Sequence, residues 1–103
     1  MKDIGKLLKQ AQQMQTKMAE MQAKLAERTV ESSSGGGMVK IVMNGQHEII
    51  SVNIDPEVVD PADVEMLEEL VAAAVNEARS KVDEMVKGEM SSLTGGLPIP
   101  GLF

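Results

Sequence analysis

The chain contains no cysteine, no tryptophan and no tyrosine, and its only aromatic residue is Phe103. The lack of cysteine excludes disulfides and thiolate metal sites, and it is typical of proteins in a reducing cytoplasm. His47 is the only histidine, which leaves no catalytic triad and no zinc cluster. No apolar run reaches the roughly 20 residues that cross a bilayer. We therefore expect a cytoplasmic protein with no enzymatic activity, cofactor, small-molecule substrate or membrane partner.

The near absence of aromatic residues also bears on nucleic acids. Proteins that read single strands usually stack the bases on aromatic side chains, and the only such side chain here is at the C-terminus. Any nucleic-acid binding is therefore expected to be to duplex, through the phosphates.

Residues 4–28 have the spacing of a long helix. Apolar side chains recur at alternating steps of three and four, which is a heptad seam; they are Ile4, Leu7, Ala11, Met14, Met18, Met21 and Leu25. At about 1.5 Å per residue this helix would be roughly 38 Å long. The remainder of a 103-residue chain is too small to cover it. Part of the helix should project into solvent or pack against another copy.

A basic stripe runs along the same helix. At about 100° per residue the cations fall within an arc of roughly 100°; they are Lys2, Lys6, Lys9, Lys17, Lys24 and Arg28. The net charge is −6, but residues 1–28 carry six basic and three acidic side chains, against four and thirteen in residues 29–103. Two interpretations stay open: an ordinary solvated helix face, or a rod that lays lysines along a polyanion.

The middle of the chain predicts three short strands. A short edge strand over 29–33 precedes a glycine turn at 35–37, and strands over 38–43 and 46–54 flank an Asn44-Gly45 type I′ turn. This turn would place Met43 opposite Gln46 and Val39 opposite Ile50, with His47 as an ordinary strand residue. One face of the hairpin would then be apolar, made by Val39, Ile41, Met43, Ile50, Val52 and Ile54.

A second helix should begin with Asp60 as N-cap and Pro61 at the first helical position, and should end near 86–87 before Gly88. The fold class is therefore α+β: a long N-terminal helix, a three-stranded antiparallel meander and a long C-terminal helix. We expect one domain over 1–88, and an apolar Gly/Pro-containing tail over 89–103 that either docks on its own dimer or is disordered. We favour disorder. So small a sheet has exposed edges, which favours a homodimer.

Four segments carry a family resemblance. Residues 9–15 (KQAQQMQ), 39–45 (VKIVMNG), 52–56 (VNIDP) and 65–78 (EMLEELVAAAVNEA) together resemble the YbaB/EbfC nucleoid-associated protein family. The resemblance implies an α-β-β-β-α protomer and an intertwined homodimer with projecting helices. It also implies a bacterial cytoplasmic protein that associates with the nucleoid, binds DNA and alters its conformation. The DNA-contacting residues that it implies are Lys2, Lys6, Lys9, Gln13 and Lys17 on the first helix, and Arg79, Lys81 and Lys87 on the second.

The leading hypothesis is a nucleoid-associated protein that binds double-stranded DNA mainly through phosphate contacts, with roles in nucleoid organisation and gene regulation. Lys24 and Arg28 join the DNA-binding set as members of the basic stripe. The alternative is a protein-interaction or holdase-like module that uses its methionine-rich helices, because methionine faces are adaptable contacts.

Overall fold

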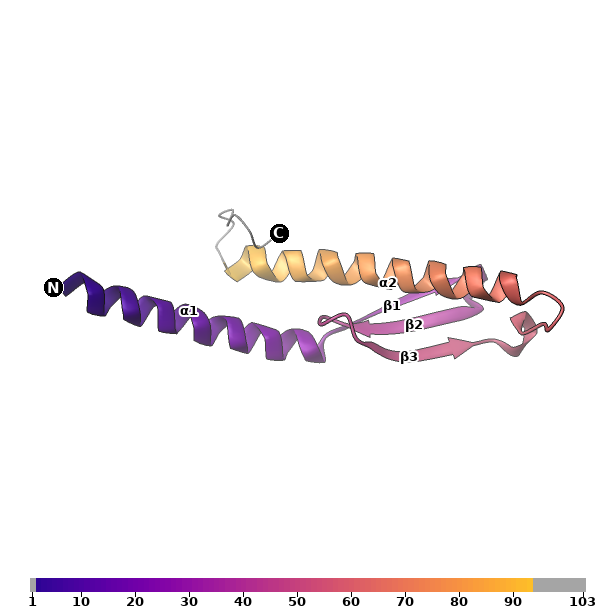
Figure 1. The fold of residues 1–103 in the computed structure, drawn as a ribbon, viewed down its shortest axis with the longest axis horizontal. Helices are drawn as coiled ribbons and strands as arrows, with labels where there is room; N and C mark the ends of the chain where they lie inside the picture. Colours follow the sequence, from indigo (N-terminus) through magenta and orange to yellow (C-terminus); the bar gives the residue numbers. More distant parts are fainter. Residues whose placement is uncertain (1, 94–103) are drawn as a thin grey trace.

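The computed structural model describes residues 2–93, with side chains over 3–92. The elements are α1 (Lys2–Glu27), β1 (Thr29–Ser34), β2 (Val39–Asn44), β3 (Ile49–Ile54) and α2 (Val64–Leu93), with 3-10 turns at Gly35–Gly37 and Pro56–Val58. The strands form one antiparallel sheet in the order β1-β2-β3. The predicted α-β-β-β-α class is confirmed. The molecule is elongated, 73 × 21 × 17 Å, and α1 extends beyond the body formed by the sheet and α2 (Figure 1).

The core lies between α2 and the first two strands. Val39 and Ile41 on β2 are fully buried, together with Ala74, Ala78 and Val82 on α2. The small alanines let β1 approach the helix closely. Two serine hydroxyls of β1 use this proximity: Ser32 donates to the Ala74 carbonyl and Ser34 to the Leu70 carbonyl, both at 2.6 Å. These contacts place α2 over β1 and β2, and β3 is left at the uncovered side of the sheet.

The predicted strand register is wrong, although the predicted apolar face is right on β2. Val39 lies opposite Ile54 rather than Ile50, and Met43 lies opposite Ile49, with an irregularity in the register between Val42 and Met43. The displacement of Val39's partner is four residues. Because side chains alternate with a period of two, an even displacement keeps the same residues on the same face.

The register shifts because the hairpin loop lies over residues 45–47 instead of 44–45, which moves the partner of Met43 by three residues, and the irregularity between Val42 and Met43 adds a fourth. The Asn44 amide donates to the Glu48 carbonyl at 3.0 Å, so the loop contains Gly45, Gln46 and His47. His47 is not a strand residue: it has φ 62°, and its Nε2 lies 2.7 Å from Asp83 Oδ1 on α2. A positive φ at the end of a three-residue loop returns the chain to the strand.

This loop also closes the C-terminal end of α1. The Gly45 amide donates to the carbonyls of Leu25 (2.8 Å) and Arg28 (3.0 Å), and Asn44 Nδ2 donates to the Ala26 carbonyl (3.2 Å). The last carbonyls of a helix have no partner within it, so these bonds satisfy them and attach α1 to the sheet.

Both predicted ends of the second helix are wrong. The N-cap is Asp63, whose Oδ1 accepts the Met66 amide at 3.2 Å, whereas Asp60 accepts the Ala62 amide in the preceding turn. At the other end α2 continues through Gly88 to Leu93, and Met90 is 5% exposed. The division into a domain over 1–88 and a tail over 89–103 remains a prediction. Of that tail, 94–103 lie outside the described residues.

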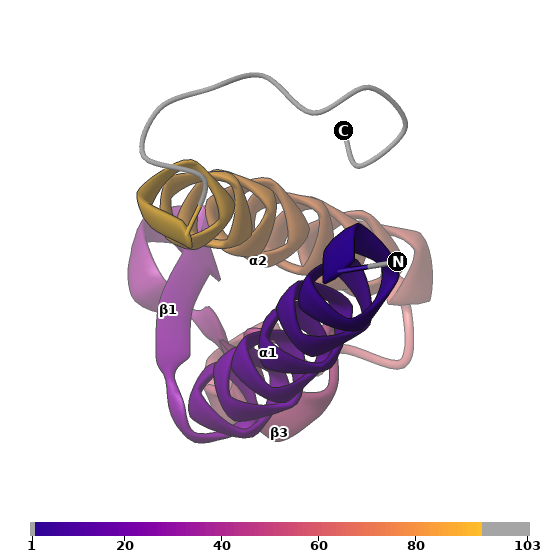
Figure 2. The same cartoon turned by 90° about the vertical axis from the view of Figure 1, so that its left-hand side faces the viewer.

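A second small core joins the two helices. Met21 and Leu25 on α1 pack with Met90 on α2, flanked by other methionine and valine side chains. The first half of the seam has no such cover, since Ile4 is 53% and Leu7 62% exposed. Figure 2, seen from the end where α1 begins, shows α1 inclined to α2 rather than parallel to it. The expectation that part of the helix projects is confirmed.

Candidate nucleic-acid interface

The basic stripe of α1 is continuous because α1 is one unbroken helix of 26 residues. Lys6, Lys9 and Lys17 are exposed, and within residues 3–92 their ammonium groups have no hydrogen-bond or ion-pair partner. The side chain of Lys2 lies outside the described part. We call Lys6, Lys9 and Lys17 the free lysines. They stand on the projecting half of α1, or at its border, where an extended polyanion has access.

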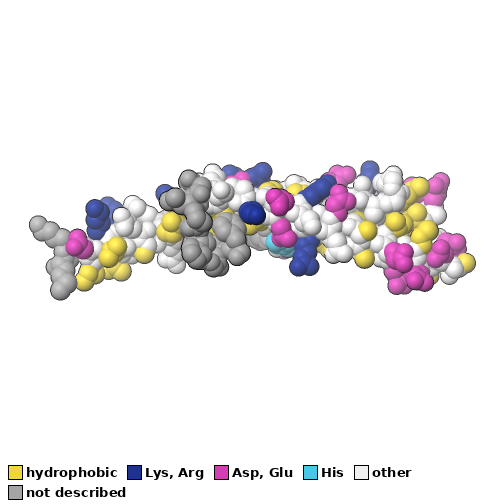
Figure 3. Space-filling model, turned by 90° about the horizontal axis from the view of Figure 1, so that it is seen from above, with side chains coloured by type: hydrophobic (Ala, Val, Ile, Leu, Met, Phe, Trp, Pro, Cys, Tyr) yellow, Lys and Arg dark blue, Asp and Glu magenta, His cyan; other side chains and the backbone are white. Residues whose placement is uncertain are grey.

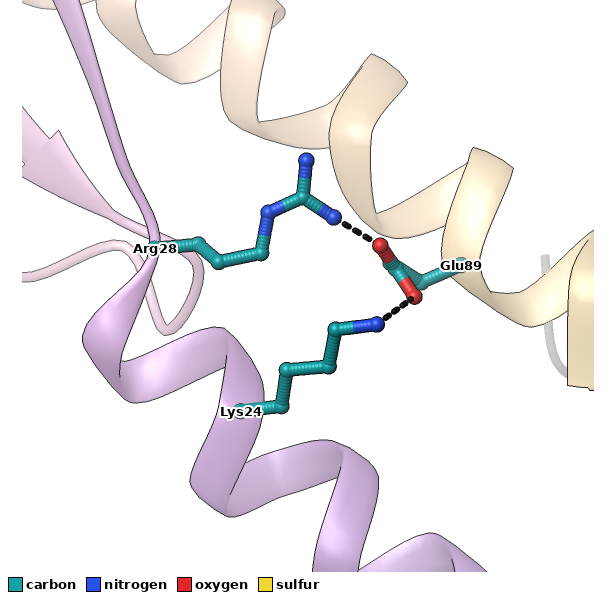
Figure 4. Close-up of polar contacts among 3 residues, drawn as sticks. All are labelled: Lys24, Arg28 and Glu89. Atoms are coloured by element: carbon teal, nitrogen blue, oxygen red, sulfur yellow. Dashed lines mark hydrogen bonds and ion pairs between the residues drawn. The ribbon is translucent and has the colours of Figure 1, made fainter.

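The two remaining stripe residues are engaged. Lys24 Nζ lies 3.3 Å from Glu89 Oε2, and Arg28 Nη1 pairs with Glu89 Oε1 (Figure 4). The carboxylate reaches across from α2 to the base of α1 and is shared by both cations. The sequence offered no signal for this arrangement, because Glu89 is separated from its partners by 65 and 61 residues.

The cations predicted on α2 do not form one surface. Lys81 is used within the fold: its Nζ donates to the Glu31 carbonyl at 2.8 Å and lies 3.3 Å from Glu77 Oε1. Arg79 and Lys87 are exposed and have no ion-pair partner among the described residues. At about 100° per residue, Arg79 and Lys81 face directions about 160° apart. α2 therefore offers separate charges rather than a stripe.

Gln13 lies beside the free lysines. It is exposed and lines a shallow groove on α1 with Lys9, Thr16, Lys17 and Glu20. A glutamine amide both donates and accepts hydrogen bonds, so it can contact a phosphate or a base edge.

Acidic side chains gather at the opposite end of the molecule. No lysine or arginine occurs between Lys40 and Arg79, whereas residues 55–69 contain seven acids. Figure 3 shows acidic side chains concentrated at the end where α2 begins, far from the projecting part of α1. Charge is thus separated along the 73 Å axis. Such a charge distribution would repel a polyanion from the acidic end and attract it to the α1 end.

Other classes of site lack support in the described part. Residues 2–93 include no group of three or more His, Cys, Asp or Glu side chains arranged to hold a metal ion. No helix among them is both long enough and apolar enough to span a bilayer.

Comparison with known proteins agrees with this geometry. The model of the YbaB/EbfC DNA-binding family matches residues 1–97. A nucleoid-associated protein of Caldanaerobacter subterraneus subsp. tengcongensis is 56% identical over 101 residues, covering 98% of this chain and 91% of that protein. A nucleoid-associated protein of Rhodospirillum rubrum is 51% identical over 100 residues, covering 97% and 94%. The crystal structure of an uncharacterized protein from Helicobacter pylori superposes with a TM-score of 0.78 at 25% identity, covering 85% of this chain and 92% of that one.

These features define a class of small α+β proteins that carry a basic helix on a sheet-and-helix body. The chain belongs to the YbaB/EbfC DNA-binding family. The family resemblance read from the sequence is confirmed.

Proposed function

We propose that the protein is a homodimeric, nucleoid-associated architectural protein that binds duplex DNA through phosphate contacts from α1. The observation that supports this most directly is the set of exposed free lysines on the projecting half of α1 or at its border, at the other end of the molecule from the concentrated acidic side chains. Lysine–phosphate contacts release condensed counterions, so affinity falls as salt rises and depends little on sequence. A DNA-binding protein of this kind organises the nucleoid by changing DNA conformation, and through that change it influences gene expression.

A second copy completes the body. β3 is an edge strand, and three of its apolar side chains are open: Ile49 (47% exposed), Ile50 (57%) and Val52 (50%). Val52 lies on the same apolar face of the sheet as Ile41. α2 covers this face over β1 and β2 but leaves it open over β3. An unpaired, apolar edge strand is a template for pairing with another chain, and exposed apolar patches mark interaction sites. A twofold dimer through β3 would bury this surface and present two α1 helices to one duplex.

The test compares two triple variants that lose the same charge. One is Lys6→Gln, Lys9→Gln and Lys17→Gln on α1. The other is Lys40→Gln, Arg79→Gln and Lys87→Gln on the body, so that the comparison also tests the two exposed α2 cations that the family resemblance implies. Binding to a fluorescent duplex is measured by anisotropy over a salt series. The α1 variant should lose most of its affinity, and its salt slope should shrink by about 0.9 for each phosphate that it no longer neutralises. Circular dichroism checks that both variants remain folded.

The body variant should bind nearly as wild type does. Equal weakening of both variants would show that total charge, rather than α1, governs binding. No binding by the wild type at low salt would reject DNA as the partner.

The exposed seam of α1 favours a second candidate, a holdase-like interaction module. Leu7 and Leu8 are 62% and 60% exposed, and Met14 is 45% exposed. Such a surface suits an apolar protein segment. Suppression of client aggregation that survives in the triple α1 variant, together with no retention of DNA, would support this candidate.

A further inference from the structure

Glu89 occupies a distinctive place among the acidic residues. Its side chain is 17% exposed, whereas those of its partners Lys24 and Arg28 are 61% and 45% exposed. Met90, next to it on α2, is buried against Met21 and Leu25. The carboxylate therefore sits at the junction where α1 leaves α2, on a part of α2 that the packing of Met90 holds against α1.

The cations that Glu89 holds belong to the basic stripe. Lys24 lies on the same face of α1 as Lys6, Lys9 and Lys17, and Arg28 lies just beyond the end of the helix. The stripe is thus divided into a free portion on the projecting half and an engaged portion at the base. Figure 4 shows both cationic side chains directed to the one carboxylate.

Ordinary surface ion pairs contribute little to stability, so the stability of this pair is not what distinguishes it. Here the anion resembles the proposed ligand. A carboxylate and a DNA phosphate diester each carry one negative charge, and both accept hydrogen bonds from lysine and arginine. Glu89 occupies the two cations as a phosphate would.

We propose that Glu89 is an internal competitor of DNA phosphate, which restrains the affinity of α1 for DNA and holds α1 at its inclination to α2 until DNA replaces it. This inference rests on the proposed function. When phosphates take over Lys24 and Arg28, the link across the helix junction opens, and α1 is then attached by the small core at Met21 and by the hairpin loop. DNA binding and the angle between the helices are therefore coupled, and the coupling acts in both directions.

The test uses Glu89→Gln with Glu84→Gln as its matched control. Glu84 is also on α2, is exposed, and has no hydrogen-bond or ion-pair partner in the described part of the chain. Each variant removes one negative charge per protomer, so a general charge effect is equal in both. Affinity for a duplex is measured by anisotropy over a salt series.

Glu89→Gln should bind about tenfold more tightly at low salt, with a salt slope steeper by about 0.9 for each additional phosphate that the protein neutralises. Glu84→Gln should change affinity by less than about twofold, since an exposed charge that holds no cation of the stripe is largely screened by salt. Equal effects of the two variants, or an unchanged affinity with Glu89→Gln, would overturn the proposal.

A second measurement is independent of DNA. The chain has no cysteine, so spin labels at Gln10→Cys on α1 and Ser80→Cys on α2 report the distance between the helices in doubly labelled protein diluted with unlabelled protein. Glu89→Gln should broaden the distance distribution relative to Glu84→Gln. An unchanged width would show that Glu89 does not hold α1, which would also overturn the proposal. Failure of wild-type DNA binding would instead reject the proposed function, and the distance measurement would still decide what Glu89 does to the helices.

Discussion

Gly45 lies directly against Leu25, at the point where the hairpin loop meets the end of α1. The Gly45 amide donates to the Leu25 carbonyl at 2.8 Å, and a Cβ on Gly45 would lie 2.6 Å from that same oxygen. Glycine is required here because the two backbones approach so closely that a side chain would not fit. A left-handed conformation is not the reason, since the positive φ of this loop belongs to His47. This contact helps to fix the position of α1, and with it the free lysines, relative to the sheet.

Gly45→Ala should therefore destabilise the protein by about 1–3 kcal/mol, because α1 or the loop must move to accommodate the methyl group. The measurement is urea unfolding followed by circular dichroism. Gly88→Ala is the control: it lies within α2, and a Cβ there meets nothing within 4 Å. It should stabilise the protein by about 0.5–1 kcal/mol. A change in unfolding free energy of the same sign in both variants would contradict the packing described at Gly45.

Met90→Ala should loosen α1 from α2. Met90 is 5% exposed and packs on Met21 and Leu25, and truncating a buried methionine costs about 2–5 kcal/mol. Amide hydrogen exchange should accelerate most over residues 18–28, where α1 contacts α2. Met66→Ala, at a side chain already 38% exposed, should leave this protection unchanged. Uniform acceleration across the chain in Met90→Ala would show that α1 has no separate attachment.

Val52→Lys should shift the protein from dimer to monomer. A lysine in the middle of the uncovered apolar face would be desolvated if a second copy packed there. Ser51→Lys places the same charge on the opposite face of β3, because neighbouring strand residues alternate. It should leave the mass in sedimentation equilibrium at the dimer value. A monomeric wild type, or dissociation by Ser51→Lys alone, would contradict a dimer built on this face.

The sequence predicted the elements and their faces better than their ends. Apolar spacing on α1 and alternation on β2 depend on local geometry, which the fold preserves. The predicted pairing of Val39 failed because the loop lies over residues 45–47 instead of 44–45 and because the register is irregular between Val42 and Met43. The position of the loop is tied to the contact of Gly45 with α1. Gly88 did not end α2, since burial of Met90 outweighs the low helix propensity of one glycine.

The candidate site was predicted in part for the same reason. The helical repeat places the cations of α1 on one face, so the basic stripe could be predicted from residue spacing alone. Lys24 and Arg28 pair with the Glu89 carboxylate, and Lys81 donates to the backbone carbonyl of Glu31. These contacts depend on tertiary packing between segments that are distant in the sequence. Spacing along the chain does not carry that information.

The most direct test of the central claim is to map the DNA contact on the protein itself. Backbone amide shifts of isotope-labelled protein are followed by NMR during titration with a short duplex at low salt. The largest perturbations should fall on residues 6–17 of α1, with little change over residues 55–69. Perturbations confined to the sheet or to the start of α2, with α1 unaffected, would contradict the account.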